Sequence, residues 1–367
     1  MSSAVIRTRP GGTASVSRPF VPAAFKLIYF FEKPCYYIVL STILPEVFMK
    51  RLLCALCALF FLSGCTPVGQ EPSQLNIVTT TYPTYLAALA VTDGIEGVSV
   101  SRLDTGSVSC LHDYTLTVND MKKLSRADVI VMNGAGLEDF MSDALAATDA
   151  LVIDCSEGID LLPAAGHHDH EHSGEDSHFD PHYWMDPNNA HTMVGNVRRG
   201  LWFLLPDAAA PDLSANTTRS FELLQPLYAL GLQYLYPRSE KAVSVPGLIT
   251  FHDGFQYLAH TFHLPLLASI EEEAGSEASA KEIVEIAQLV KEHNIPVIFT
   301  EINGSDATAQ AVARETGCAV ASLSMIMDGR EPTAEDASPM APYAELMLNN
   351  LYTLINGFAG QEVLCAP

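Results

Sequence analysis

The sequence predicts an α/β protein of two lobes, each with a mostly parallel sheet flanked by helices, joined by one long rigid helix. Two observations carry this prediction. Short, nearly continuous apolar strands alternate with helical segments twice along the chain, which is typical of parallel sheets covered on both faces. The length of 367 residues also gives each half enough chain to bury its own core. We expect a ligand cleft between the lobes, at the carboxyl ends of the strands.

The N-terminal lobe is expected over residues 75–187. Its strands are predicted at 75–80, 98–100, 129–132 and 151–153, and its helices at 85–90, 119–125 and 138–146. A helix over residues 188–206, which begins after an Asp-Pro pair and ends at a proline, is expected to connect the lobes. The C-terminal lobe follows over residues 207–363. Its strands are predicted at 247–251, 266–270, 296–300 and 319–323, and its helices at 213–235, 254–261, 280–293, 307–316 and 343–358.

Three segments precede the first lobe. Residues 1–48 come before a second methionine, Met49, and are interpreted as an over-extended gene start; a membrane segment there is disfavoured by charges and prolines. Residues 49–64 have the basic start and apolar stretch of a secretory signal. The run Leu-Ser-Gly-Cys at its end resembles the processing site of bacterial lipoproteins, which implies a lipid on Cys65. Residues 65–74 are then a tether to the outer face of the cytoplasmic membrane.

The chain is strongly acidic. It has 20 Lys and Arg against 43 Asp and Glu, a net charge of −23. Without residues 1–64, which hold seven of the basic and two of the acidic residues, the net charge is −28. Such a field repels nucleic acid and favours a cationic ligand. Four cysteines of the exported part have undetermined pairing, and no Cys-x-x-Cys spacing there indicates a thiolate metal site: Cys110, Cys155, Cys318 and Cys365.

Five histidines crowd into a segment at 166–178 that has no large apolar residue with which to build a core. They are His167, His168, His170, His172 and His178. Imidazoles and carboxylates at this density predict an accessory loop that binds metal weakly, and a solvated linker is an equal alternative. Nothing in the segment fixes the geometry that a tight site needs.

Three other histidines each follow a predicted strand or lie in a loop that faces the expected cleft: His112, His182 and His252. One such residue alone is more often an ordinary polar loop residue. Three in matched positions across two lobes predict one shared metal site. Three neutral imidazoles suit Zn²⁺, whereas carboxylate-rich sites suit Mn²⁺. Asp113 and Asp253 follow two of these histidines and are expected either to orient the imidazoles or to cap helices.

The segments around these histidines resemble the zinc- and manganese-binding solute receptors of ABC importers, a family with a helical backbone. The resemblance rests on His-Asp-Tyr at 112–114 with Asn-Gly-Ala-Gly-Leu-Glu at 133–138, on Asp-Pro-His-Tyr-Trp-Met-Asp-Pro at 180–187, and on Phe-His-Asp-Gly-Phe at 251–255. It implies a monomeric receptor, not an enzyme, that passes metal to an ABC permease. It also implies zinc as the cargo, because zinc receptors carry His, and manganese receptors Glu, at the third position.

The fourth ligand is where the sequence departs from this family. Ser324 occupies the position at which many members carry an aspartate, so water or Asp328 is expected to complete the site, with Glu301 as a further alternative. Cys110 and Leu111 also replace a proline that usually precedes the first histidine. A zinc hydrolase is the main alternative function, although no His-Glu-x-x-His run supports it. A manganese receptor, an adhesin and a zinc store are further alternatives.

Overall fold

The computed structural model describes residues 74–105, 114–164, 179–270 and 279–365, which belong to one compact unit of the chain. The signal, most of the tether, His112 and the histidine-rich loop lie outside these residues. Within the described ranges, no helix is both long enough and apolar enough to cross a bilayer.

Both predicted sheets are confirmed, and each has four parallel strands. The first has the order β2-β1-β3-β4, formed by β1 (Leu75–Thr79), β2 (Val98–Arg102), β3 (Val129–Met132) and β4 (Leu151–Asp154). The second has the equivalent order β6-β5-β7-β8, formed by β5 (Leu248–Phe251), β6 (Leu266–Ser269), β7 (Val297–Glu301) and β8 (Ala319–Leu323). Because the strands of each sheet are parallel, all their carboxyl ends lie at one edge of that sheet, where ligands are commonly bound.

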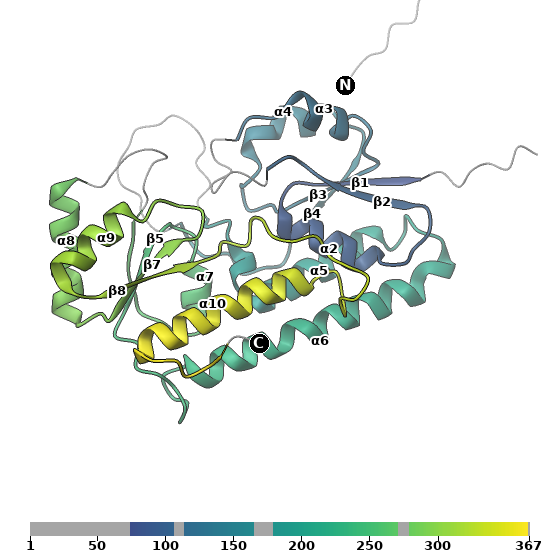
Figure 1. Cartoon of the computed structure of the whole chain (residues 1–367). Coiled ribbons are helices and arrows are strands. Elements are labelled where there is room, and N and C mark those ends of the chain that lie inside the picture. The colour runs from purple at the N-terminus through teal and green to yellow at the C-terminus, as the bar shows by residue number, and fades with distance from the viewer. Residues whose placement is uncertain (1–73, 106–113, 165–178, 271–278, 366–367) are drawn as a thin grey trace, which may run out of the picture. The chain divides into compact units, whose positions relative to one another are not determined.

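Helices cover the sheets on both faces (Figure 1). In the first half they are α2 (Tyr82–Thr92), α3 (Val118–Leu124) and α4 (Ser142–Ala146), the last preceded by a short 3₁₀ turn, η1 (Asp139–Met141). In the second half they are α7 (Gln256–Thr261), α8 (Ala280–His293), α9 (Ala307–Thr316) and α10 (Ala341–Ala359). The helix expected over residues 138–146 is therefore split, because Glu138 lies in the preceding loop and uses its side chain there.

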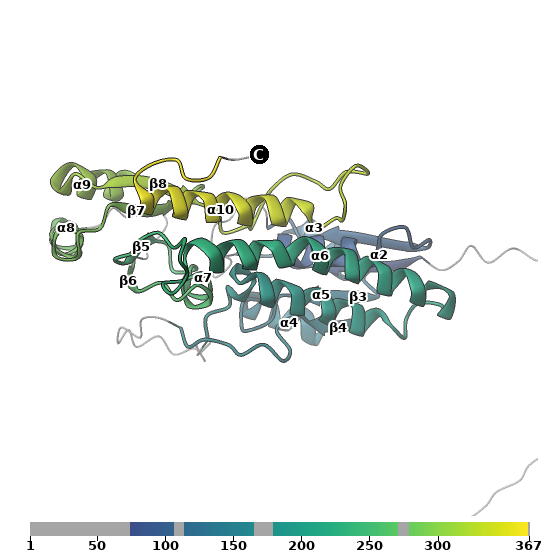
Figure 2. The ribbon, with the colours of Figure 1, turned by 90° about the horizontal axis from the view of Figure 1, so that it is seen from below.

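Two long helices follow one another between the sheets in the chain, α5 (Pro187–Leu201) and α6 (Ala210–Tyr234), with the turn η3 (Asp207–Ala209) before α6. The expected connector corresponds to α5, which packs on α2, α6 and β4, whereas the longer α6 also contacts α10 and is the last helix before β5. Figure 2 shows α5, α6 and α10 side by side. The lobe boundaries remain a prediction.

A single hydrophobic core runs through the inner faces of both sheets. It includes Ile77 and Val131 of the first sheet, Val197 of α5, and Phe299 and Leu354 of the second half. Two smaller clusters fill the outer faces, one under α3 and one under α8 and α9. The two halves therefore share buried apolar surface.

The loop after β8 adds polar contacts between the halves. The hydroxyl of Tyr82 on α2 donates to the carbonyl of Arg330, and the hydroxyl of Tyr85 donates to Glu331 at 2.9 Å. The guanidinium of Arg102, at the end of β2, lies 4.9 Å from the Tyr82 ring centre. These contacts hold this loop across the carboxyl edge of the first sheet.

Candidate metal site

His182 lies at the start of a 3₁₀ turn, η2 (Tyr183–Met185), directly before α5. The helix start is well defined, because the Asp186 side chain accepts the Asn188 backbone N–H at 2.8 Å and Pro187 occupies the first helical turn. The His182 side chain is 8% exposed. A defined helix start thus fixes the backbone that carries this imidazole.

Asp180 orients the His182 ring. Its Oδ1 atom lies 2.8 Å from His182 Nδ1 and accepts the His182 backbone N–H at 2.9 Å. Because a carboxylate accepts hydrogen bonds, Nδ1 carries the proton and Nε2 keeps its lone pair for another partner. No role for Asp180 was predicted from the sequence, although the Asp-x-His spacing was a visible signal for it.

His252 follows β5 directly, and its ring centre lies 5.7 Å from that of His182. Its Nδ1 atom is 3.6 Å from Oε2 of Glu301, the last residue of β7. The side chain of His252 is 14% exposed and that of Glu301 4%. Adjacent strands of the second sheet therefore bring an imidazole and a carboxylate to the same edge, beside the imidazole of His182.

The carboxyl group of Glu301 is buried and largely shielded from water. Burial raises the pKa of its carboxyl to about 7, and the nearby His182 offsets part of that rise. A buried carboxylate of this kind is stabilised by a cation, which favours its charged form. The geometry and the electrostatics both make Glu301 suitable for a bound cation.

Asp328 pairs with a residue of the first sheet and not with His252. Its Oδ1 atom pairs with the Arg102 guanidinium at 3.4 Å, and its side chain is 48% exposed. Of the two carboxylates considered for the fourth position, the structure thus brings Glu301, and not Asp328, next to His252.

His112 lies outside the described residues, but both flanks of its segment are described. Asp120 accepts the Asp104 backbone N–H at 2.9 Å and the Tyr114 hydroxyl at 2.7 Å. Burial alone would raise the pKa of Asp120, but the surrounding hydrogen-bond donors lower it. One carboxylate therefore fixes the two ends of the segment that carries His112. Thr105, at the first end, donates to the Thr80 carbonyl just after β1.

Glu138 ties the carboxyl edge of the first sheet together. Its carboxylate accepts the Thr80 hydroxyl at 2.6 Å and the backbone N–H groups of Asn133 and Gly134 at 2.7 and 2.9 Å. Complete burial raises its pKa to about 7, although these hydrogen bonds oppose the rise. The Asn133 side chain in turn donates to the carbonyl of Pro181, the residue before His182. The Asn-Gly-Ala-Gly-Leu-Glu run thus positions the His182 segment.

Gly134 is required in this turn by its conformation and by its close neighbours. Its φ is +81°, and an added Cβ would collide with the Asp154 carboxylate. Gly158 has a similar φ of +76° but open space around it. We expect Gly134→Ala to lower the free energy of unfolding by roughly 3 kcal/mol and Gly158→Ala by roughly 1 kcal/mol. Urea unfolding followed by circular dichroism measures both, and equal losses would show that the collision is harmless.

No three His, Cys, Asp or Glu side chains of the described ranges are grouped closely enough to hold an ion by themselves. The structure brings together two of the three histidines singled out in the sequence, with a carboxylate beside them. The five histidines of the loop lie outside the described residues. Of the exported cysteines, Cys155, Cys318 and Cys365 are free, and Cys110 is among the undescribed residues.

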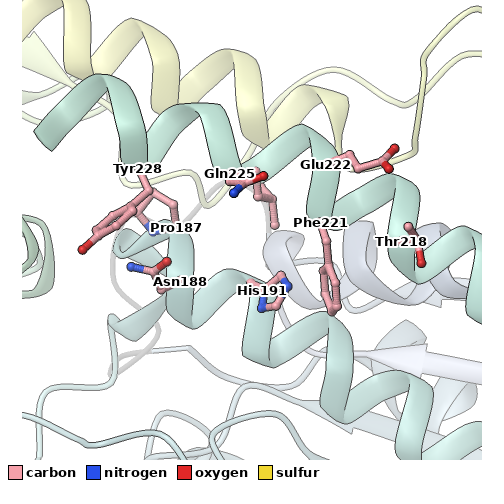
Figure 3. Close-up of a pocket in the computed structure, with 9 residues that line it drawn as sticks. Pro187, Asn188, His191, Thr218, Phe221, Glu222, Gln225 and Tyr228 are labelled. Carbon is pink, nitrogen blue, oxygen red and sulfur yellow. The ribbon is translucent and has the colours of Figure 1, made fainter. Parts of the chain in front are cut away.

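A separate groove of about 370 Å³ lies between α5 and α6. Figure 3 shows His191 of α5 and Phe221 of α6 pointing toward each other in it. Their ring centres are 3.3 Å apart, and burial lowers the pKa of His191. Neither His182 nor His252 lines this groove, so it is separate from the candidate metal site as the described residues show it.

The sequence profile of the family described as zinc-uptake complex component A, periplasmic, matches residues 77–357. The chain belongs to this family. The zinc-binding lipoprotein AdcA of Streptococcus pneumoniae is 30% identical over 316 residues, covering 83% of this chain and 60% of that relative. A putative metal-binding protein of Treponema pallidum is 29% identical over 220 residues, covering 58% of this chain and 68% of that protein. The chain thus spans about three fifths of the length of its streptococcal relative.

Solved structures of similar proteins have the same fold. The Zn(II)-bound ZnuA-like domain of Streptococcus pneumoniae AdcA superposes with a TM-score of 0.62 at 27% identity, covering 78% of this chain and 99% of that one. FpvC of Pseudomonas aeruginosa, in complex with Mn²⁺, gives a TM-score of 0.64 at 26% identity, with the same two coverages. The family fold of two parallel sheets with long helices is therefore confirmed.

Proposed function

We propose that this chain is an extracytoplasmic receptor that captures Zn²⁺ and delivers it to the permease of an ABC importer. The observation that carries the proposal is the juxtaposition of His182 and His252 with the buried Glu301 at the carboxyl edges of two sheets. Family membership and the zinc-binding relatives support it. Zinc enters as cargo, so the site needs ligands and no catalytic base.

The proposed ligands are His112, His182 and His252, with Glu301 in the fourth position. Three imidazoles and one carboxylate give the tetrahedral nitrogen and oxygen set that Zn²⁺ accepts. Glu301 replaces Asp328 in this proposal, because Asp328 already pairs with Arg102 and is half exposed. Asp180 supports the set by holding the tautomer of His182.

Substituting each carboxylate separates these two candidates for the fourth ligand. We expect Glu301→Gln to weaken zinc binding roughly 100-fold, since it removes a charged ligand while keeping its size. Asp328→Asn is the matched control and should leave the affinity unchanged. Competition titration against a zinc chelator dye measures both. If Asp328→Asn weakened zinc binding and Glu301→Gln did not, Asp328 would be the fourth ligand.

Metal preference is open to a direct test, because FpvC is described in complexes with Mn²⁺ and with Ni²⁺. Three imidazoles favour the later transition metals over Mn²⁺. The purified mature chain is expected to carry about one tightly bound zinc, with weaker ions on residues 167–178. Elemental analysis after dialysis, repeated on a variant that lacks this loop, tests the prediction. A stoichiometry that falls to zero without the loop would make the loop the principal site.

Delivery to a permease and the lipid on Cys65 are separate parts of the proposal. The lipoprotein relative AdcA supports an anchor, and the signal-like residues 49–64 support export. A strain that lacks this gene should grow poorly under zinc chelation and recover with added zinc. Unchanged growth would instead favour storage or adhesion at the cell surface.

A further inference from the structure

Three consecutive apolar residues are exposed in the turn that follows α5. Trp202 is 36% exposed, Phe203 90% and Leu204 43%. Single exposed apolar residues are ordinary in soluble proteins, but a contiguous group marks a surface that contacts another apolar phase. We call residues 202–204 the apolar turn. It plays no part in the candidate metal site.

The apolar turn lies toward the edge of the first sheet that is opposite the metal site. Two contacts give the direction of α5 relative to β4. Asn196 donates to the carbonyl of Cys155, just after the end of β4. One turn later in α5, a Cβ atom added to Gly200 would meet Ile153, which lies inside β4. The helix therefore runs antiparallel to β4, and the next turn approaches the start of that strand. Leu151 and Val152 at that start are 44% and 38% exposed, which extends the apolar surface.

The exported chain enters the fold at this same edge. Leu75 begins β1, which is parallel to β3 and β4, so its entry and the start of β4 share one edge. Figure 1 shows β1 and α6 both beginning on one side of the molecule. Nine residues lie between Cys65 and Leu75, which gives ten Cα–Cα steps and a reach of at most about 35 Å, or about 17 Å for a flexible chain. A lipid on Cys65 would keep the bilayer within that distance of Leu75, at the edge of the first sheet toward which the apolar turn lies.

We propose that the apolar turn inserts into the interface of the bilayer to which the chain is tethered, an inference that rests on the proposed lipid anchor. Tryptophan favours the headgroup region, where its apolar ring and its polar N–H are both satisfied, and phenylalanine and leucine can bury their apolar side chains at the boundary with the acyl chains. Arg198 lies 5.5 Å from the Trp202 ring centre and brings a cation to this surface of an otherwise acidic chain. Such a cation is attracted by anionic headgroups.

Insertion would give the tethered receptor a preferred resting orientation. The α5 helix spans about 22 Å between its two ends, with the His182 turn at one end and the apolar turn at the other. The His182 turn, with His252 beside it, then lies about one length of α5 farther from the bilayer than the apolar turn. Docking on a permease has to compete with this orientation.

The two tryptophans of the chain allow a direct test, because Trp184 is fully buried and Trp202 is exposed. The full chain is purified from bacterial membranes and its mass is measured. It is then reconstituted into phosphatidylethanolamine and phosphatidylglycerol vesicles that contain brominated phosphatidylcholine. We expect the brominated lipid to quench the fluorescence of Trp202, and the emission maximum of Trp202 to shift to shorter wavelength. Trp202→Phe should remove the quenched component, and Phe203→Ser with Leu204→Ser should abolish the quenching while zinc binding stays intact.

Each result tests a different part of the proposal, either the lipid anchor or the insertion of the apolar turn. A mass without acyl chains on Cys65 overturns the anchor, and with it this inference, while leaving zinc binding to be judged by metal analysis. A lipidated chain whose Trp202 emission is unchanged by brominated lipid overturns the inference alone. If the serine variants then lower zinc uptake in cells, the apolar turn contacts a protein instead of lipid.

Discussion

Replacing both His182 and His252 by alanine is expected to weaken zinc binding by about 10⁴-fold. Structural zinc sites bind their ion with about 10–16 kcal/mol in total, and on that scale each of four ligands accounts for roughly 3 kcal/mol. The two rings lie 5.7 Å apart at the edges of different sheets, and no other described imidazole is placed to replace either. Competition with a chelator of known affinity measures the loss.

His293→Ala is the matched control for this double variant. His293 is an exposed histidine at the end of α8, and it has no contact with the candidate site in the described structure. Its removal should leave zinc affinity within about twofold of the original value. A double variant that still holds one zinc as tightly as the control would exclude the proposed site.

Trp184→Ala is expected to lower the free energy of unfolding by about 3–5 kcal/mol, the range for removing a large buried aromatic side chain. Trp184 is fully buried, and its Nε1–H donates to the Met325 carbonyl at 2.9 Å, across the two halves. Its ring centre also lies 5.2 Å from that of His182. Loss of the indole should therefore loosen both the loop after β8 and the imidazole beside it. Urea unfolding by circular dichroism measures the change.

Trp202→Ala provides a matched comparison, because it removes the same side chain from a position that is 36% exposed. Its effect should stay below about 1 kcal/mol. Trp184→Phe keeps most of the packing and removes the hydrogen bond, so a loss of about 1–2 kcal/mol is expected. Similar losses for both alanine variants would mean that Trp184 does not join the halves.

Local pattern was sufficient to predict most of the fold. Runs such as the Val-Ile-Val-Met of β3 are apolar at every position, which is typical of a short parallel strand covered on both faces. The 138–146 helix was predicted too long because Glu138 accepts hydrogen bonds from Asn133 and Gly134 instead of continuing a helix. Such a tertiary demand on one side chain leaves no periodic signal in the sequence.

The candidate site was less accessible to sequence reasoning. His182 and His252 could be singled out, because strand ends of parallel sheets are natural ligand positions. The sequence favoured water or Asp328 over Glu301, because the pairing of Asp328 with Arg102, which is distant in sequence, leaves no local signal. Whether His112 joins the other two histidines remains a prediction.

The shared core between the sheets has a consequence for unloading. Swinging the halves widely apart would expose part of the core that they share, including Trp184, which now reaches Met325 of the second half, at a cost of about 25 cal/mol for each Å² exposed. Thermal motion alone would then rarely free an ion held between the sheets. Local rearrangement of the segments that bear the imidazoles exposes less apolar surface than separation of the halves. We therefore expect the ion to be released by such a rearrangement, triggered by docking on the proposed permease.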